Sequence, residues 1–173
     1  MKSLFAAACA AGAILCAGPA LAQSTNFGLS PTYYGTLGYS DFNNTNSSAD
    51  LSAVTGRLGA RLSPYLGAEG EVSVGVGNSS GLHLNDQYAG YAVGYLPLQP
   101  NLDLLARVGY GHSDLNIEGN GPSFGADSWN FGAGAQYFFD HHNGIRADYT
   151  REDFQCGHCG DANVWSIAYV RKF

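Results

Sequence analysis

The last stretch of the chain, Trp165-Ser-Ile-Ala-Tyr-Val-Arg-Lys-Phe173, alternates between two kinds of side chain. Successive side chains of an extended strand point to opposite faces, so these residues divide into two sets. One set is Trp165, Ile167, Tyr169, Arg171 and Phe173, and the other is Ser166, Ala168, Val170 and Lys172. An apolar face with aromatic residues at both ends, backed by small or charged residues, is typical of a membrane β-barrel strand. The stretch therefore predicts a membrane-spanning strand, provided that the rest of the chain supplies partners for it.

The N-terminus has the three parts of a secretory signal peptide. Lys2 supplies a positive charge, Leu4 to Leu15 is an apolar run, and Ala20-Leu21-Ala22 is a small-residue cleavage site. We therefore expect residues 1–22 to be removed and residues 23–173 to form one outer-membrane β-barrel domain.

Two-residue alternation recurs along the remaining chain and helical periodicity is almost absent, which predicts an all-β fold. Strands of roughly ten residues suit a tilted membrane crossing. Eight are expected, at residues 32–40, 53–62, 65–76, 87–96, 101–111, 128–139, 145–154 and 165–173. The connections alternate between long polar ones (41–50, 77–86, 112–127, 155–163) and short ones (63–64, 97–100, 140–144). That order is expected of a barrel whose short turns and two termini face the periplasm.

Aromatic residues on the expected outward faces fall into two groups according to height. The periplasmic group is Tyr33, Tyr95, Phe139 and Phe173, and the outer group is Tyr39, Tyr110, Trp129 and Trp165. The strand at 87–96 is placed with Ala89, Tyr91, Val93 and Tyr95 outward. Aromatic girdles at both water interfaces are characteristic of outer-membrane barrels. The predicted fold class is an eight-stranded antiparallel up-and-down transmembrane β-barrel.

Three segments carry a resemblance to a known family: Tyr34-Gly-Thr-Leu-Gly-Tyr-Ser40, Tyr65-Leu-Gly-Ala-Glu-Gly-Glu71 and Val108-Gly-Tyr-Gly111. They resemble the OmpA/OmpX-type small outer-membrane β-barrels, also called porin-family barrels, over essentially the whole chain after the leader. The resemblance implies the outer membrane of a Gram-negative bacterium, contact with its lipid and lipopolysaccharide, and recognition by the barrel-assembly machinery. It also implies that the terminal Phe173 belongs to the assembly signal. Arg171 departs from the family pattern, and we expect it at the periplasmic rim.

The expected inward faces carry as many basic as acidic residues. These are Arg57, Arg61, Arg107, Arg146 and Lys172, with Glu69, Glu71, Asp103, Asp148 and Glu152. An eight-stranded barrel is only wide enough for its side chains to fill, and buried charges need partners. The set therefore predicts a polar plug, with Arg57 facing the Glu69/Glu71 region across the turn at 63–64. The alternatives are a lumen that conducts ions through a gate and a lumen that holds bound water without a role.

The remaining surface is acidic. Outside the lumen set and the leader, nine acidic residues stand against two basic ones. Such a surface argues against binding of nucleic acid or of a bare anionic surface. Solvation and mutual repulsion explain it, although divalent cations shared with lipopolysaccharide phosphates are an alternative. No connection has an ordered spacing of metal ligands, so no metal or other cofactor is expected.

Cys156-Gly-His-Cys159 matches the spacing of thioredoxin-type redox sites, which stand at a helix N-terminus after a strand. Here the motif lies between two barrel strands, so a small disulfide between Cys156 and Cys159 is the expected state in an oxidising compartment. Metal binding through Cys156, His158 and Cys159 and redox exchange are alternatives. The other cysteines, Cys9 and Cys16, lie in the expected leader.

Candidate catalytic residues are few. His112-Ser113 beside Asp114 has hydrolase residue types, but adjacent strand residues point to opposite faces. Histidines in Asp140-His141-His142 are expected in a solvated turn. The sequence thus predicts a monomeric, non-enzymatic protein with a structural or surface-interaction role, such as envelope integrity or adhesion. A narrow pore, a lipid-modifying outer-membrane enzyme and a soluble lipocalin-like carrier with inward aromatics are the alternatives.

Overall fold

The strands pair antiparallel with their neighbours in sequence, and β1 also pairs with β8, so the sheet closes into a barrel. They are β1 (Thr32–Asn44), β2 (Asp50–Arg61), β3 (Leu66–Gly75), β4 (Leu82–Gln99), β5 (Leu102–Ile117), β6 (Ser123–Phe138), β7 (Asn143–Phe154) and β8 (Asp161–Lys172). Closure pairs every edge, which lets the backbone polar groups be satisfied in lipid. The predicted eight-stranded up-and-down barrel is confirmed.

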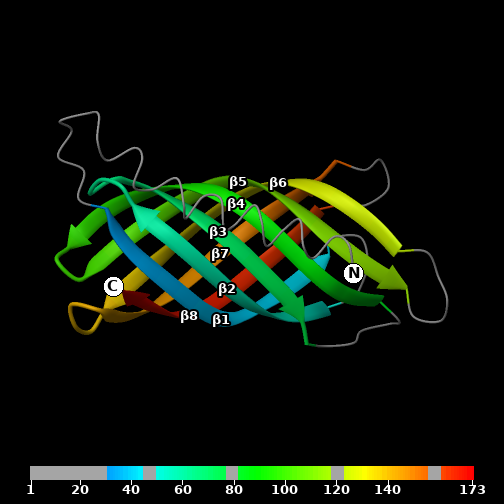
Figure 1. The fold of residues 1–173 in the computed structure, drawn as a ribbon, viewed down its shortest axis with the longest axis horizontal. Helices are drawn as coiled ribbons and strands as arrows, with labels where there is room; N and C mark the ends of the chain where they lie inside the picture. The colour runs from blue at the N-terminus through cyan, green and yellow to red at the C-terminus, as the bar shows by residue number, and fades with distance from the viewer. Residues whose placement is uncertain (1–30, 45–49, 77–81, 118–122, 156–160) are drawn as a thin grey trace. The chain divides into compact units, whose positions relative to one another are not determined.

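The computed structural model describes residues 31–44, 50–76, 82–117, 123–155 and 161–173. All of them belong to one unit, Pro31–Phe173. None of these segments forms a helix with the length and apolar character needed to cross a membrane. Figure 1 shows the C-terminus at the left end of the barrel, together with the short connections β2–β3, β4–β5 and β6–β7.

Polarity is distributed over the two faces of the strands in the sense opposite to that of a soluble protein, with apolar side chains outward and polar ones inward. In β7 and β8 the inward positions are buried and most of the outward positions are exposed. The outward side chains include large apolar ones, such as Leu37, Leu58 and Ile167, each more than 60% exposed. The inward positions carry many buried charged and hydroxyl groups. An apolar exterior around a polar interior requires lipid as the surrounding solvent.

A carboxylate holds the turn between β6 and β7. Asp140 accepts hydrogen bonds from the backbone N–H of His142 at 2.7 Å and of Asn143 at 2.6 Å, and from the Asn143 side chain at 2.8 Å. These donors, that of the Asn143 side chain foremost, lower the pKa of Asp140 to about 2. The expected position of both turn histidines is confirmed, because His141 and His142 are exposed.

The outer ends of the strands extend further than predicted. β5 continues to Ile117 and β6 begins at Ser123, so both enter the connection expected at 112–127, and β4 begins at Leu82. The pairs Leu82↔Ile117 and Asn116↔Ser123 mark this extension. Above the membrane both faces of a strand can be polar, because the backbone pairs while the side chains are solvated. The alternation on which the prediction relied is therefore lost there.

At the opposite end, β4 continues through Pro97 to Gln99, where a turn at 97–100 was predicted. A register shift between Pro97 and Gln99 accompanies this extension. Proline has no N–H to donate, so it is tolerated where the ladder is irregular.

The predicted orientation of β4 is wrong. Tyr91, Val93 and Tyr95 are buried in the lumen, and Tyr88, Gly90 and Ala92 face outward. The prediction placed the larger apolar side chains toward lipid, but a tyrosine can also fill a polar lumen through its hydroxyl. Tyr95 therefore leaves the periplasmic girdle, whose other members, Tyr33, Phe139 and Phe173, are exposed.

Candidate functional site

The middle of the lumen holds a group of buried charges that we call the central charge cluster. Its members are Arg57 on β2, Glu69 and Glu71 on β3, Arg107 on β5, and Arg146 and Asp148 on β7. Alternation places each of these side chains inward, and the narrow barrel brings opposite walls within reach of an arginine. All six were among the residues that the sequence placed in the lumen.

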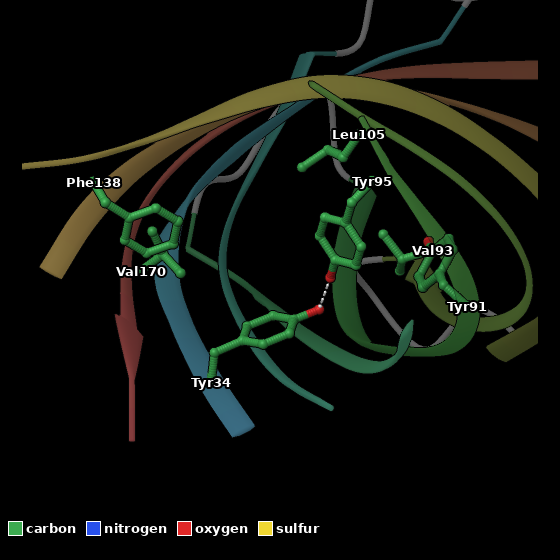
Figure 2. Close-up of a cluster of buried hydrophobic side chains, with 7 residues drawn as sticks. All are labelled: Tyr34, Tyr91, Val93, Tyr95, Leu105, Phe138 and Val170. Atoms are coloured by element: carbon green, nitrogen blue, oxygen red, sulfur yellow. Dashed lines mark hydrogen bonds between the residues drawn. The ribbon is translucent and has the colours of Figure 1, made fainter. Parts of the chain in front are cut away.

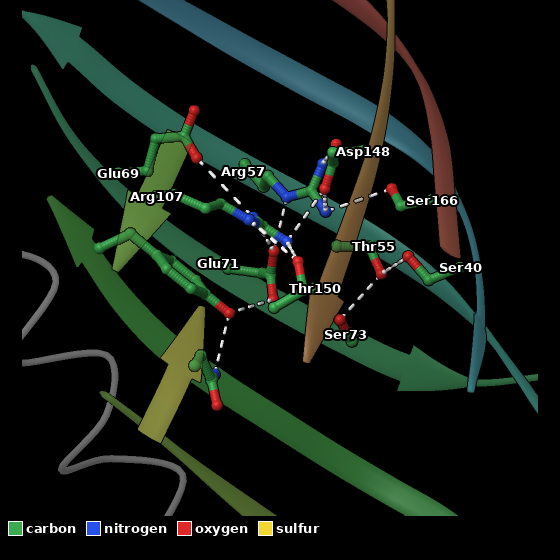
Figure 3. Close-up of polar contacts among 12 residues, drawn as sticks. Ser40, Thr55, Arg57, Glu69, Glu71, Ser73, Arg107, Asp148, Thr150 and Ser166 are labelled. Carbon is green, nitrogen blue, oxygen red and sulfur yellow. Dashed lines mark hydrogen bonds and ion pairs between the residues drawn. The ribbon is translucent and has the colours of Figure 1, made fainter. Parts of the chain in front are cut away.

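Glu71 is shared by two arginines from opposite sides. The Nε of Arg57, its cross-strand neighbour, lies 2.5 Å from Glu71 Oε2. The Nη1 of Arg107 lies 2.8 Å from the same oxygen, and Figure 3 shows both contacts. The carboxylate thereby ties β2, β3 and β5 together.

Asp148 and Glu69 complete the cluster across the lumen. Asp148 lies 3.2 Å from Arg57 Nη1, 3.0 Å from Arg107 Nη2 and 3.1 Å from Arg146 Nε. Arg146 also donates through both Nη atoms to Glu69. Three arginines thus meet three carboxylates, which gives a neutral and closed set. Breaking such a set is costly, because each removed partner leaves a buried charge unpaired.

Neutral side chains take up the remaining donors of the arginines. Thr150 Oγ1 accepts from Arg107 at 3.1 and 2.5 Å, and Ser166 Oγ accepts from Arg57 at 3.2 Å. The Arg107 guanidinium also lies 4.4 Å from the centre of the Tyr91 ring, a cation–π distance. Because Tyr91 points inward from β4, its ring contacts an arginine of the central charge cluster directly.

Toward the periplasm the lumen becomes partly apolar. Arg61 Nη1 contacts Asp103 Oδ2 at 2.9 Å, and the Lys172 ammonium lies 3.4 Å from the centre of the Phe138 ring. Figure 2 shows the apolar group: Tyr34, Tyr91, Val93, Tyr95, Leu105, Phe138 and Val170. The sequence interpretation placed Val170 inward but overlooked Leu105 and Phe138. The available signal was their position in the alternation: Leu105 lies between the inward charges Asp103 and Arg107 on β5. Phe138 is two residues from the inward Gln136 on β6.

At the outer end, Glu152 is buried beside Gln87, whose Nε2 donates to Glu152 Oε1 at 2.7 Å. Among the described residues, no arginine or lysine makes an ion pair with Glu152. Each of the ten predicted lumen residues thus lies on an inward face, but Glu152 and Lys172 stand apart from the ion pairs.

The candidate catalytic residues are not brought together. His112 faces outward, with its Nδ1 2.6 Å from Asp127 Oδ1 and its ring 5.4 Å from that of Tyr88. Ser113 points into the lumen. Within the described ranges no three His, Cys, Asp or Glu side chains are arranged to hold a metal ion. Cys156 and Cys159, with the expected disulfide, lie outside the described residues, as does the expected leader.

Phe173 closes the strand that pairs with β1. Its N–H donates to Tyr33 O at 2.9 Å, while its ring is 73% exposed.

We predict that Phe173→Ala changes the unfolding free energy of the purified barrel little, because the ring buries little area against protein. The same change should lower the amount of folded protein in the outer membrane several-fold, if the ring is an assembly signal. Heat-shift gels of membrane fractions and refolded protein separate the two effects; Tyr169→Ala, on the same outward face, is the control. Equal amounts of folded wild-type and Phe173→Ala protein in the outer membrane would show that the Phe173 ring is not part of an assembly signal.

An apolar exterior, exposed aromatic residues near both ends and a largely polar lumen define an integral membrane β-barrel protein. The sequence matches the outer membrane protein beta-barrel domain over residues 7–173, and the chain belongs to that family. Its location is therefore the outer membrane of a Gram-negative bacterium, as the resemblance implied.

Solved structures share this fold at low sequence identity. Ail, the attachment invasion locus protein of Yersinia pestis, is 16% identical with a TM-score of 0.62, over 83% of this chain and 99% of that one. The N-terminal barrel of Pseudomonas aeruginosa OprF is 15% identical with a TM-score of 0.65, over 82% and 97%. Neisserial surface protein A is 12% identical with a TM-score of 0.60, over 83% and 97%. Comparison with curated proteins gives no match.

Proposed function

We propose that this protein has a structural and surface-interaction role in the outer membrane, with a lumen closed to solutes. The observation that carries the proposal is the central charge cluster. Its contacts cross the barrel, from Arg57 on β2 to Asp148 on β7 and from Arg146 on β7 to Glu69 on β3. These strands are not neighbours in the sheet, so the bonds bridge the lumen. A closed lumen leaves the two ends of the barrel as the parts available for interaction.

The outer end is the better candidate for contact with other surfaces. β4, β5 and β6 are the longest strands, with 18, 16 and 16 residues, and they extend past the outward Tyr110 and Trp129. Outside the lumen, the acidic residues there with described side chains are Asp41, Asp86, Asp114, Asp127, Asp153 and Asp161, against Arg151 as the basic one. The Ail structure contains the heparin analogue sucrose octasulfate. An acidic end opposes polyanions, so we propose a neutral or cationic partner here.

The first test is conductance. Purified wild-type protein in planar bilayers should show no steady current above the bare membrane. A double variant, Arg107→Ser with Glu71→Ser, removes one cation and one anion from the central charge cluster and should introduce discrete conducting events. Persistent current through the wild type would instead support the pore alternative and overturn the closed lumen.

The surface role is tested by removing the outer ends of β5 and β6 together with the connection between them. Residues 112–127 can be replaced by Asn-Gly, because Gly111 and Ser128 are already paired across the two strands. The variant should keep its heat shift on gels and lose adherence of whole cells to neutral or cationic surfaces. Unchanged adherence would leave only the structural role. For the proposed mature domain, residues 23–173, N-terminal sequencing of the same preparation would test the start at residue 23.

A further inference from the structure

The charges of the lumen are balanced in number but separated along its axis. The central charge cluster is neutral. On its periplasmic side, Arg61 and Lys172 face the single carboxylate of Asp103. On its outer side, Glu152 is the only charged side chain that points inward among the described residues. The outer end of the lumen therefore carries a negative charge whose counterpart lies beyond the cluster.

The groups around Glu152 are already engaged elsewhere. Its cross-strand neighbour Asn130 donates to Tyr91 Oη at 2.9 Å and accepts from Ser128 at 2.8 Å. Arg107 directs its donors to Glu71, Thr150 and Asp148. Glu152 itself is 2% exposed. A buried carboxylate with one amide donor and no ion-pair partner is strongly disfavoured in its charged form, so Glu152 either holds a proton or requires a further positive partner.

In the same outer half of the lumen, two buried oxygen atoms have no hydrogen-bond partner among the described residues. They are Gln87 Oε1 and Ser113 Oγ, on residues that are only 1% and 2% exposed. The Gln87 amide turns its NH₂ toward the carboxylate, because a carboxylate only accepts hydrogen bonds. Its carbonyl oxygen is then without a donor. Gln87 and Ser113 are direct partners across β4 and β5, and both point inward. Gln87 therefore connects the two, because its side chain contacts the Glu152 carboxylate and its cross-strand partner is Ser113.

We propose that these groups form a binding site for one monovalent alkali cation in the outer half of the lumen. The ligands are a Glu152 carboxylate oxygen, Gln87 Oε1 and Ser113 Oγ. Carboxylate, amide and hydroxyl oxygens are the ligands that hard cations prefer. One carboxylate supplies one negative charge, so Na⁺ or K⁺ neutralises the site, whereas Ca²⁺ would leave a buried positive charge. The bound ion would complete the charge balance at this end of the barrel.

The test compares unfolding of the refolded barrel in NaCl, KCl and N-methylglucamine chloride, at constant ionic strength, pH 8.5 and with EDTA. A ligand that binds only the folded state raises stability in proportion to its occupancy. The unfolding midpoint should rise with Na⁺ or K⁺ and stay low in N-methylglucamine, which is too large for the site. Broadening of the ²³Na resonance by the folded protein provides a direct readout.

Glu152→Gln keeps the shape and should remove both the cation dependence and the ²³Na broadening. Ser113→Ala should shift the cation response to several-fold higher concentration. Asp153→Asn is the matched control, because the next carboxylate on β7 is exposed and faces outward; it should respond like the wild type. Equal midpoints in all three salts would overturn the site and indicate a protonated Glu152. Stabilisation by Ca²⁺ without EDTA, but not by Na⁺ or K⁺, would overturn the monovalent assignment.

Discussion

Replacing Arg146 by methionine will lower the unfolding free energy of the barrel by about 3–5 kcal/mol, the usual cost of removing one partner of a buried ion pair. The Arg146 side chain is fully buried and contacts Glu69 and Asp148. Methionine fills a similar volume, so the loss is electrostatic rather than a cavity. Glu69 would keep the Tyr34 hydroxyl at 2.6 Å, which carries no charge, and Arg107 Nη1 only at 3.9 Å.

The matched control lies on the same strand. Arg151 pairs with Asp161 at the outer end, but its side chain is 56% exposed. Arg151→Met should therefore change stability by no more than about 1 kcal/mol. Urea titrations in lipid vesicles, followed by tryptophan fluorescence, measure both variants. Adding Glu69→Gln to Arg146→Met should restore part of the loss, because it removes the buried carboxylate that has lost its nearest cation. Equal losses for the two arginine variants would show that the central charge cluster contributes nothing beyond a surface pair.

The architecture could be predicted because lipid imposes a simple rule on alternate residues. Leu37, Leu58 and Ile167 face outward as expected, since nothing but acyl chains can cover them. The rule fails in β4, where both faces carry apolar or small residues. There the hydroxyls of Tyr91 and Tyr95 decide the orientation, through partners on β1, β3 and β6.

The contacts of the lumen were harder to predict than its composition. Counting inward charges indicated a balanced set, but the partner of each charge depends on the tilt and stagger of the closed sheet. Arg57 meets its neighbour Glu71, as the β2–β3 turn implied, and it also meets Asp148, on a strand far from β2 in sequence. The lack of an ion pair between Glu152 and any described arginine depends on the same geometry. No pattern along the chain could have shown it.

Gly38→Ala should destabilise the barrel by about 2–3 kcal/mol, although it adds a single methyl group. Gly38 lies opposite Ala168, in the pair of strands that closes the barrel. A Cβ at residue 38 would lie 2.2 Å from the carbonyl oxygen of Ile167 and 2.5 Å from Ala168 Cα. These obstacles are backbone atoms, which cannot move aside by a rotamer change. β1 and β8 would have to separate at that point, with loss of ladder hydrogen bonds.

Gly56→Ala is the corresponding change one strand away, where Gly56 pairs with Leu37, the neighbour of Gly38. A Cβ there would meet no atom within 4 Å. Alanine loses less backbone entropy on folding than glycine, so this variant should be stabilised by up to about 1 kcal/mol. Urea titrations measure the change in unfolding free energy for both variants. Changes of opposite sign would show that a glycine is required at 38 because the backbones of β1 and β8 approach closely there, and not because of strand propensity. A loss below about 0.5 kcal/mol for Gly38→Ala would mean that the seam relaxes easily, since overpacking in a rigid structure costs at least twice that.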